Sequence, residues 1–265
     1  MKRFPWRTFW TSALVCVALS GFSSAHAGKK SLRVTSEPGT KRLYRMQAQN
    51  ETSFAGMVIT ENQSGDVEVE ALEHDADDNP RFAFRFANFD ASVMQGDNMA
   101  EQDPQLNGVV VHVTLSPRGE QLNLSPQSNL SPERRRLVRG IAEAFFAYLP
   151  EDQVDRDDTW VQERLEEGDE DGTPAIDGEM EYTLENFEKK DGQECAKLHL
   201  EGEFKVNSLT PGGPFAGKAK TEGETLVALS GGHVMNSKVT TEITGSVGTQ
   251  EVSRVQYLEL KMRKP

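Results

Sequence analysis

Cys195 and His199 are the residues whose types and spacing first suggest covalent chemistry. A cysteine nucleophile needs a base within hydrogen-bond reach. The surrounding residues alternate between polar and apolar, which predicts a strand, and four strand residues span ~13 Å. The two side chains therefore share a face with Lys197 and Glu201 but lie too far apart to form a hydrogen bond. We expect both on the polar surface and discount them as a catalytic pair.

The remaining histidines offer no metal or catalytic cluster. His74 lies in a turn-forming segment, His112 in the middle of a strand pattern, and His233 after a pair of glycines. Metal and acid–base sites bring several such side chains together, whereas these three are scattered. The sequence also has no GxSxG elbow, HExxH motif or P-loop. We therefore predict no catalytic residues, no metal ligands and no cofactor.

Two acidic segments have the carboxylates that Ca²⁺ prefers. In His74–Pro80, an EF-hand register would need glycine and glutamate where the sequence has Pro80 and Phe86. Acids, Asn and Pro are common in turns, so we interpret this segment as a solvated hairpin tip. Glu166–Gly172 has the same character. Weak cation binding at either segment is the alternative.

Four arginines, Arg134, Arg135, Arg136 and Arg139, form a basic cluster in an acidic chain. Three consecutive arginines in the first turn of a predicted helix oppose its macrodipole, at a small local cost. We interpret the cluster as a solvated face paired with the protein's own acids. A contact with an anion or a partner is the alternative.

The first 27 residues are typical of a cleaved signal peptide. A positively charged start precedes a short apolar run from Thr11 to Phe22, and Ala25-His26-Ala27 matches the pattern that signal peptidase reads. The run is too short for a transmembrane helix, which needs ~20 apolar residues. We expect an exported protein, periplasmic or extracellular after cleavage near Ala27, with residues 28–40 as a flexible lead-in.

Charge and cysteine content restrict the classes of partner. The net charge is −13, and removing a leader with Lys2, Arg3 and Arg7 and no acid lowers it by three, to −16. Such a surface repels nucleic acid phosphates and favours solubility. We expect no nucleic acid partner and no integral membrane segment in the mature chain. Cys16 leaves with the leader, so Cys195 remains alone and cannot form an intramolecular disulfide.

The remaining chain predicts a mainly β fold with one helix. Ser131 and Pro132 are a typical helix start, and the helical period of apolar residues up to Pro150 predicts an amphipathic helix over 132–149. Strand patterns flank it on both sides, at 43–48, 54–60, 67–71, 82–86, 109–115 and 121–124, and at 160–165, 180–184, 196–206, 225–230, 233–244 and 252–262. Residues 210–224, rich in Gly, Pro and Thr, predict a loop. We expect a single β-rich domain over 41–265, an antiparallel half-barrel or sandwich packed by the helix.

The hairpin at Asp191-Gly192 allows a strand register to be calculated. A two-residue turn pairs Lys190 with Gln193. Without a shift, that register would place the core residue Leu184 opposite His199 on the polar face. One extra residue resolves the conflict, so we predict a β-bulge at about 185–187 that pairs Leu184 with Leu198. The residues that we expect to be buried together are Phe82, Phe84, Phe86, Val111, Val113, Ile141, Phe145, Leu198 and Leu200.

Several short motifs resemble those of exported bacterial β-rich domains of unknown function. They are Tyr44 to Ala48, Val113 to Gly119, and the stretch from Leu149-Pro150 through Val154 to Trp160. In that group a proline and a valine precede a Gly-Asp-x-Trp element, whereas this chain has Asp157 where glycine is usual. The resemblance covers most of residues 41–262 and implies a fold and a compartment. It implies no activity and no catalytic residues.

Our leading hypothesis is a non-catalytic binding module that holds an apolar small molecule, a lipid or a partner protein in a β-lined concavity. A structural or envelope-assembly protein without a small ligand is the second hypothesis, and an enzyme of unrecognised type is the third. A cavity between the helix and the sheet would separate the first two, because a filled core leaves no room for a ligand.

Overall fold

The computed structural model describes residues 28–127, 129–168, 174–210 and 213–263. The predicted signal peptide, residues 1–27, lies outside the described residues, and so do residues 169–172 of the second acidic segment. No helix in these described ranges has the length and apolar character needed to cross a membrane.

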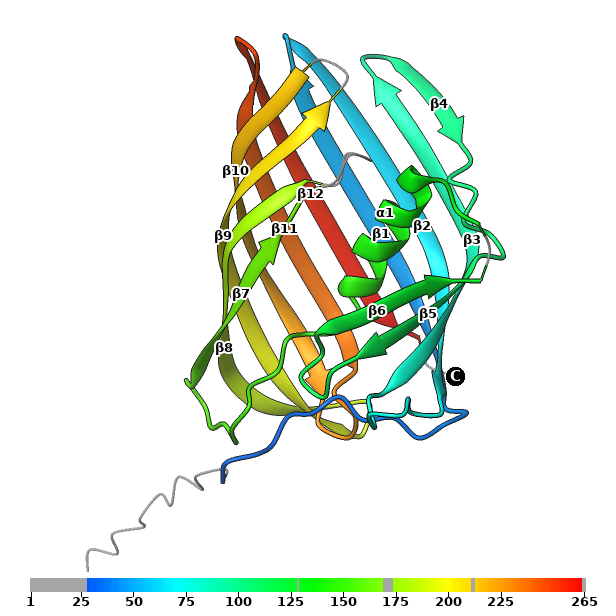
Figure 1. The fold of residues 1–265 in the computed structure, drawn as a ribbon, viewed down its shortest axis with the longest axis vertical. Coiled ribbons are helices and arrows are strands. Elements are labelled where there is room, and N and C mark those ends of the chain that lie inside the picture. Colours follow the sequence, from blue (N-terminus) through cyan, green and yellow to red (C-terminus); the bar gives the residue numbers. More distant parts are fainter. Residues whose placement is uncertain (1–27, 128, 169–173, 211–212, 264–265) are drawn as a thin grey trace, which may run out of the picture.

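Twelve strands form one antiparallel sheet, which confirms the predicted mainly β fold. The strands are β1 Lys41–Phe54, β2 Met57–Leu72, β3 Arg81–Gln95, β4 Asn98–Gln102, β5 Val110–Leu115, β6 Gln121–Pro126, β7 Thr159–Glu166, β8 Ala175–Lys190, β9 Gln193–Thr210, β10 Gly213–Ala228, β11 Val234–Val247 and β12 Gln250–Met262. Their order is β6-β5-β3-β2-β1-β12-β11-β10-β9-β8-β7, with β4 paired to β3. The sheet curves into an open half-barrel, and helix α1 lies on its concave side (Figure 1).

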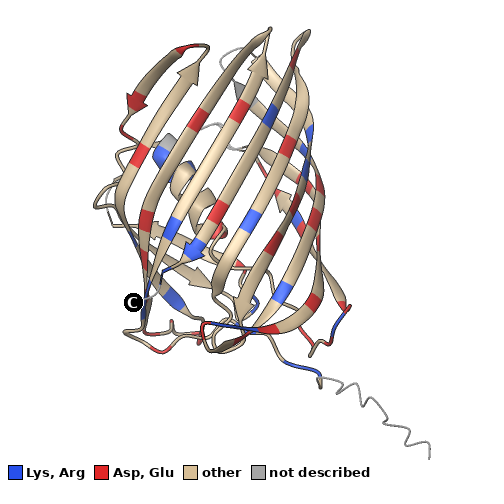
Figure 2. Ribbon diagram, turned by 180° about the vertical axis from the view of Figure 1, so that it is seen from behind, with Lys and Arg blue, Asp and Glu red and all other residues tan. Residues whose placement is uncertain are grey.

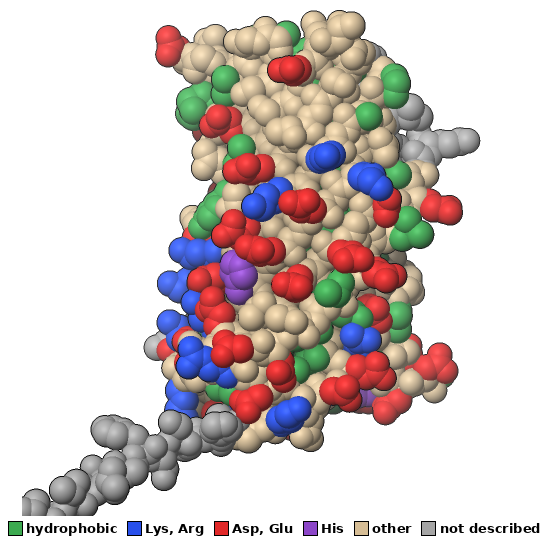
Figure 3. Space-filling model, turned by 90° about the vertical axis from the view of Figure 1, so that its left-hand side faces the viewer, with side chains coloured by type: hydrophobic (Ala, Val, Ile, Leu, Met, Phe, Trp, Pro, Cys, Tyr) green, Lys and Arg blue, Asp and Glu red, His purple; other side chains and the backbone are tan. Residues whose placement is uncertain are grey.

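Alternation along the strands separates a concave apolar face from a charged convex face. In β1, Tyr44 and Met46 are buried, whereas Lys41, Leu43 and Gln47 are exposed. Charged residues of both signs are spread along the strands (Figure 2), and acidic side chains predominate on the surface at the left of Figure 1 (Figure 3). Each of the nine core residues named above is at most 6% exposed, so the predicted core is confirmed.

Helix α1 spans Pro132–Glu143, which is shorter than the predicted helix over 132–149. Its start is as expected, with Ser131 as the N-cap and proline in the first turn. Beyond Glu143 the backbone bonds to other segments: Phe146 pairs with His233, and the Leu149 N–H donates to the Arg118 carbonyl at 2.8 Å. These tertiary hydrogen bonds replace helical ones, although the segment stays buried as its apolar pattern predicts.

Strand β10 occupies residues for which the sequence pattern predicted a loop, so the predicted loop over 210–224 is wrong. Small residues such as Gly217, Ala219 and Thr221 face the concave side, and Lys218 and Lys220 alternate with them. Gly, Pro and Thr are the residues that usually indicate loops. Here such residues belong to a strand whose inward side chains are small and therefore project little into the concavity.

The hairpin between β8 and β9 has the predicted register. Lys190 pairs with Gln193, the register shifts between Leu184 and Asn186, and Leu184 then pairs with Leu198. The bulge keeps the apolar residues of both strands on the concave face, as calculated from the alternation.

Residues 28–40, for which the sequence suggests a flexible lead-in, make specific contacts below the half-barrel (Figure 1). Lys30 pairs with Val154, and the Val34 N–H donates to the Pro117 carbonyl at 2.8 Å. Leu32 and Val34 are at most 2% exposed and belong to the main core. This segment therefore packs against the lower end of the concave face.

Candidate functional site

A cavity of about 480 Å³ lies between the helix region and the concave faces of β8 to β12. Small-molecule sites typically have volumes of ~300–1,000 Å³. Most of its lining is apolar, and the large apolar side chains from the sheet include Met180, Leu200, Phe204, Val239, Ile243 and Leu258. Ala144 and Phe146, just beyond α1, line the opposite side.

Glycines on the concave face give the aromatic rings room to lie against the sheet. A Cβ atom on Gly202 would lie 2.8 Å from the ring of Phe204, and one on Gly178 would lie 2.9 Å from it. Phe215 covers Gly217 in the same way, with a separation of 2.6 Å. Because these rings take the space of missing side chains, they extend less far into the concavity, which keeps the cavity open.

The hydroxyl groups in the cavity wall bond to one another. The Thr221 and Thr241 hydroxyl oxygens are 3.0 Å apart, and those of Thr225 and Ser237 are 2.8 Å apart. Each of these hydroxyl groups has at least one hydrogen-bond partner within the wall, which lowers the cost of placing it beside apolar groups. The wall therefore presents a surface suited to apolar groups even where polar residues contribute to it.

Arg164 of β7 lines the cavity and is neutralised by two carboxylates. Its Nη2 atom lies 3.0 Å from Glu143 of α1 and 2.5 Å from Glu166 of β7. Burial raises the pKa of the Glu143 carboxyl, and the charge of Arg164 offsets part of that rise. The ion pair joins α1 to the edge strand β7.

A polar cleft beside this ion pair is lined by Tyr148 and Tyr182, and Trp160 packs against Tyr182. The Trp160 ring stacks on the ring of Tyr182 with centroids 5.9 Å apart, and the Trp160 Nε1–H donates to the Tyr148 carbonyl at 2.8 Å. Burial raises the pKa of Tyr182 to about 12, so its phenol stays neutral. The hydroxyl donates to Gln162 at 3.2 Å. These contacts hold the edge of the cavity wall in place.

Arg254 of β12 is the second arginine in the cavity wall, and its neutralisation is weaker. Its Nη2 atom lies 3.9 Å from the nearest carboxylate oxygen, on Glu61 of β2. Its Nε and Nη2 atoms both donate to the side-chain oxygen of Gln256 at 3.1 Å, in the amide orientation that satisfies both groups. Burial lowers the pKa of the Arg254 guanidinium, and the charge of Glu61 only partly counters this.

Cys195 is fully buried, so its expected position on the polar surface was wrong. It packs with Leu226, Ala228 and Met235 in a small apolar cluster, and its thiol donates to the Gln193 carbonyl at 3.6 Å. Burial raises the pKa of the thiol above its ordinary value. A thiol in these surroundings is a poor nucleophile.

His199 lies on the convex face, beside Glu201 and Glu222. Its Nε2 atom is 3.3 Å from a Glu201 oxygen. Over the described ranges, this trio is the one group of three His, Cys, Asp or Glu residues whose ligand atoms lie within 4.8 Å of one another. Exposed acids commonly gather in this way without an ion. We assign no metal to them.

The acidic segment His74–Pro80 has the hydrogen bonds of a tight turn. The Asp75 carboxylate accepts from the backbone N–H groups of Asp77 and Asn79, each at 2.9 Å, and the bond from Asn79 is the main cause that lowers its pKa. His74 lies 2.8 Å from Asp78. The oxygen atoms of Asp75 are thus used within the turn, as the hairpin-tip interpretation requires.

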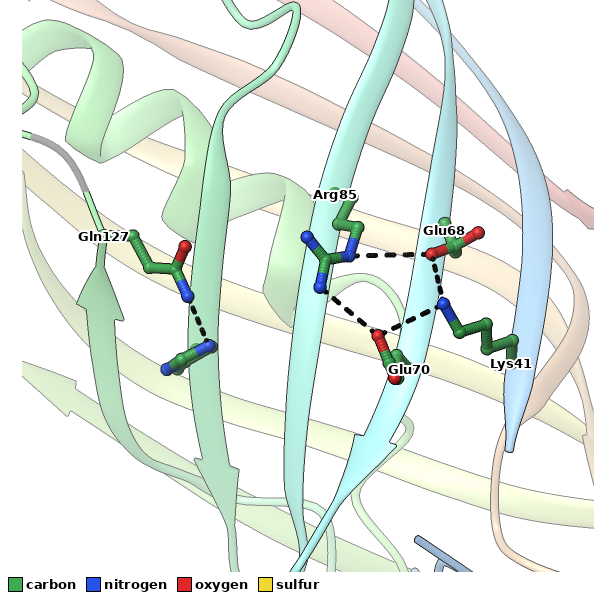
Figure 4. Close-up of polar contacts among 6 residues, drawn as sticks. Lys41, Glu68, Glu70, Arg85 and Gln127 are labelled. Carbon is green, nitrogen blue, oxygen red and sulfur yellow. Dashed lines mark hydrogen bonds and ion pairs between the residues drawn. The ribbon is translucent and has the colours of Figure 1, made fainter. Parts of the chain in front are cut away.

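Other charged and polar candidates belong to networks on the convex face. His112 bonds to Gln127 at 2.9 Å, and Lys41 and Arg85 each pair with both Glu68 and Glu70 (Figure 4). In the arginine cluster, Arg135 is exposed and Arg139 lines the polar cleft beside Arg164.

The sequence interpretation missed Arg254 and Gln256 as residues of the site. The signal was present, because alternation places both on one face with Leu258 and Leu260. A charged side chain in a set of inward-facing apolar positions indicates a special environment.

No family model and no curated protein matches this sequence. Among solved structures, the chain is similar to one described as "Lipid-protein interactions in lipovitellin", with 12% sequence identity and a TM-score of 0.58. That match covers 86% of this chain and 25% of the other, so this chain spans about a quarter of its length. At this identity the likeness shows the fold alone.

A second match is a DUF1329 family protein from Desulfovibrio piger, with 12% identity over 84% of this chain and 86% of that one. Its TM-score of 0.18 is too low to bear on the fold.

Proposed function

We propose that this protein is a non-catalytic binding module that holds a small apolar molecule, or the acyl chain of a lipid, on its concave face. The observation that carries the proposal is the cavity of about 480 Å³ between the helix region and β8 to β12. Apolar ligands gain free energy from leaving water, at roughly 25 cal/mol per Å² of apolar surface buried. The self-paired hydroxyl groups and the glycine-backed rings support an apolar occupant.

The cavity also favours ligand binding over a purely structural role. A structural or envelope-assembly protein without a ligand would be expected to fill this space, because proteins pack their interiors densely. Gly178, Gly202 and Gly217 instead leave this space open, because they have no side chains. The likeness in fold to lipovitellin is compatible with a lipid-binding concavity.

We also propose that the protein acts outside the cytoplasm, after removal of residues 1–27. The charged start, the short apolar run and Ala25-His26-Ala27 support this location. In that compartment a concave apolar cavity would shield a hydrophobic molecule from water. We propose no cofactor, no nucleic acid partner and no catalytic step for this site.

A neutral fluorescent probe tests the proposal without bias towards any charge. N-phenyl-1-naphthylamine, which fluoresces in apolar surroundings, should bind the purified chain and be displaced by long-chain alcohols. The variant Ala219→Phe adds a ring to the cavity wall, where Ala219 lies beside Phe204 and Ile243 on the neighbouring strands. We expect this variant to lose most of the fluorescence signal.

The matched control is Lys220→Phe, which adds the same ring to the opposite face of β10. It should keep the wild-type signal. Equal binding by both variants would place the probe elsewhere, and absence of binding by the wild type would reject the proposed function. Native mass spectrometry of protein purified from its source should also detect a retained ligand as added mass.

A further inference from the structure

We propose that the ligands of this cavity carry an anionic head group, and that Arg254 binds it at the end of the cavity near the β11–β12 hairpin. This inference rests on the proposed function and adds the chemical class of the ligand. The class is a single-chain amphiphile with a carboxylate or a similar anion. Arg254 lies four residues from Gln250, where β12 begins at the upper end of the half-barrel (Figure 1).

The two arginines of the cavity wall differ in how far carboxylates compensate their charge. Arg164 has carboxylate oxygens at 3.0 Å and 2.5 Å, so its charge is compensated twice. Arg254 has one carboxylate at 3.9 Å, which exceeds the length of a charge-assisted hydrogen bond. In the described part of the chain, the contacts of its guanidinium use Nε and Nη2, and Nη1 takes part in none of them.

The charge of Arg254 lies beside apolar side chains of the cavity wall. Ile243 is the cross-strand neighbour of Arg254 on β11, and Leu258 lies on the same face of β12. An apolar wall lowers the local dielectric and strengthens the attraction between a guanidinium and an anion. The side chain of Arg254 retains 37% of its accessibility and lines the cavity, so an occupant can reach it.

The lining of the cavity extends along β11. Val234 and Ile243 both line it, and the nine-residue step between them along β11 corresponds to roughly 30 Å of strand. An extended acyl chain fits a site of this form, with its head at Arg254 and its tail towards Val234. A guanidinium is well suited to a carboxylate, because two parallel N–H groups can bind both oxygens.

The overall charge of the protein makes this a demanding prediction. A chain with a net charge of −13 attracts cations and repels anions at long range. A preference for anionic ligands must therefore come from local contacts within the cavity. If the cavity bound cationic ligands more tightly than anionic ones, the net negative charge of the protein would be sufficient to explain it.

Three amphiphiles with the same tail provide the test, each measured by calorimetry below its micelle concentration. They are dodecanoate, dodecanol and dodecyltrimethylammonium. We expect dodecanoate to bind roughly tenfold to hundredfold more tightly than dodecanol, as hydrogen bonds to a charged group predict. The cationic amphiphile should bind most weakly. The variant Arg254→Gln should reduce the affinity for dodecanoate to that for dodecanol.

Control variants separate the head-group site from general effects of charge and folding. Lys238→Gln removes one positive charge from the pair with Glu259 on the convex face and should leave all three affinities unchanged. Arg254→Lys keeps the charge but loses the two parallel N–H groups, so it should weaken the preference for dodecanoate without reversing it. If the Arg254→Gln variant fails to fold, an undiminished preference in folded Arg254→Lys would count against the assignment to Arg254.

The outcomes distinguish this inference from the proposed function. If dodecanol and dodecanoate bind the wild type equally well, the anionic head group is rejected and the apolar site stands. If the preference for dodecanoate persists in Arg254→Gln, the assignment to Arg254 is wrong. If neither ligand binds, both proposals fail.

Discussion

His233 is a buried residue whose ring has no compensating contact. It is 4% exposed, and within the described ranges neither ring nitrogen has a hydrogen-bond partner. Burial, together with the nearby charge of Arg42, lowers its pKa from 6.5 to about 3. The ring is therefore neutral in the folded protein at neutral pH, and protonating it would place an unpaired charge in the interior.

We expect His233 to make the folded state less stable in acid. Well above pH 6.5 the ring is neutral in both the folded and the unfolded chain, so it adds no pH dependence there. As the pH falls from 6.5 towards 3, the unfolded chain takes up a proton that the folded chain does not, and the free energy of unfolding decreases. Between pH 7 and pH 4 the loss due to this residue should be roughly 3 kcal/mol.

The measurement is urea unfolding of the wild type and of His233→Leu at several pH values. The variant should become more stable relative to the wild type as the pH falls, because its side chain does not titrate. Carboxyl groups also titrate in this range, and taking the difference between the two proteins removes their contribution. His199→Leu on the convex face is the control for losing a histidine. A constant difference between wild type and His233→Leu would contradict the assignment.

At the scale of single residues, alternation predicted which side chains face the core but not where the convex face is covered. The phenylalanines at 82, 84 and 86 were predicted from period two and are at most 1% exposed. Cys195 follows the same rule and points to the convex side, yet Leu226, Ala228 and Met235 cover it. These neighbours come from β10 and β11, so no local pattern around Cys195 could indicate its burial.

At the scale of elements, helix α1 depends on its N-cap. The Ser131 hydroxyl accepts from the Arg134 N–H at 3.4 Å. The three consecutive arginines of the first turn, Arg134 to Arg136, oppose the helix macrodipole. We expect Ser131→Ala to lower the free energy of unfolding by about 0.5–2 kcal/mol, because one N–H group of the first turn loses its acceptor.

Chemical denaturation measures this change directly. The control is Ser253→Ala, at an exposed strand position opposite Ser53, which should alter stability by less than about 0.5 kcal/mol. Equal effects of the two substitutions would mean that Ser131 does not act as a cap.

The elements differ in how far the sequence could predict them. The bulge between Leu184 and Asn186 could be calculated, because a turn and two alternating strands constrain one another. The end of α1 could not, because the segment after Glu143 bonds to Arg118 and His233, which are distant in sequence. The first part of β10 was hidden because its inward residues from 217 to 223 are glycine, alanine and threonine. Their function is to leave space, which a pattern of large apolar residues does not reveal.

At the scale of the whole molecule, the single sheet argues for one folding unit. Strands from both sides of α1 join where β1 pairs with β12, and the main core includes residues from the lead-in to Leu260. We therefore propose that the predicted domain over residues 41–265 is one unit and that the lead-in packs as part of it. Strands β6 and β7 lie at the two edges of the sheet. Sequence patterns specify neither these edges nor the cavity, because both depend on contacts between strands that precede α1 and strands that follow it.

If the cavity binds its ligand only in the folded state, occupancy should stabilise the whole domain. At a ligand concentration 100 times its Kd, the free energy of unfolding should rise by about 2.7 kcal/mol. We expect dodecanol to raise the midpoint of urea unfolding accordingly, without changing the slope of the transition. Trp160 is the one tryptophan in the sequence of residues 28–265, so in a protein without residues 1–27 its fluorescence reports on β7, while circular dichroism reports on the whole sheet. Both signals should shift together, because a single cooperative unit unfolds at once.

The cavity-filling variant Ala219→Phe should show no such shift, because the added ring occupies the space of the ligand. A shift of equal size in that variant would mean that dodecanol binds outside the cavity, and separate transitions for the two signals would contradict the single domain.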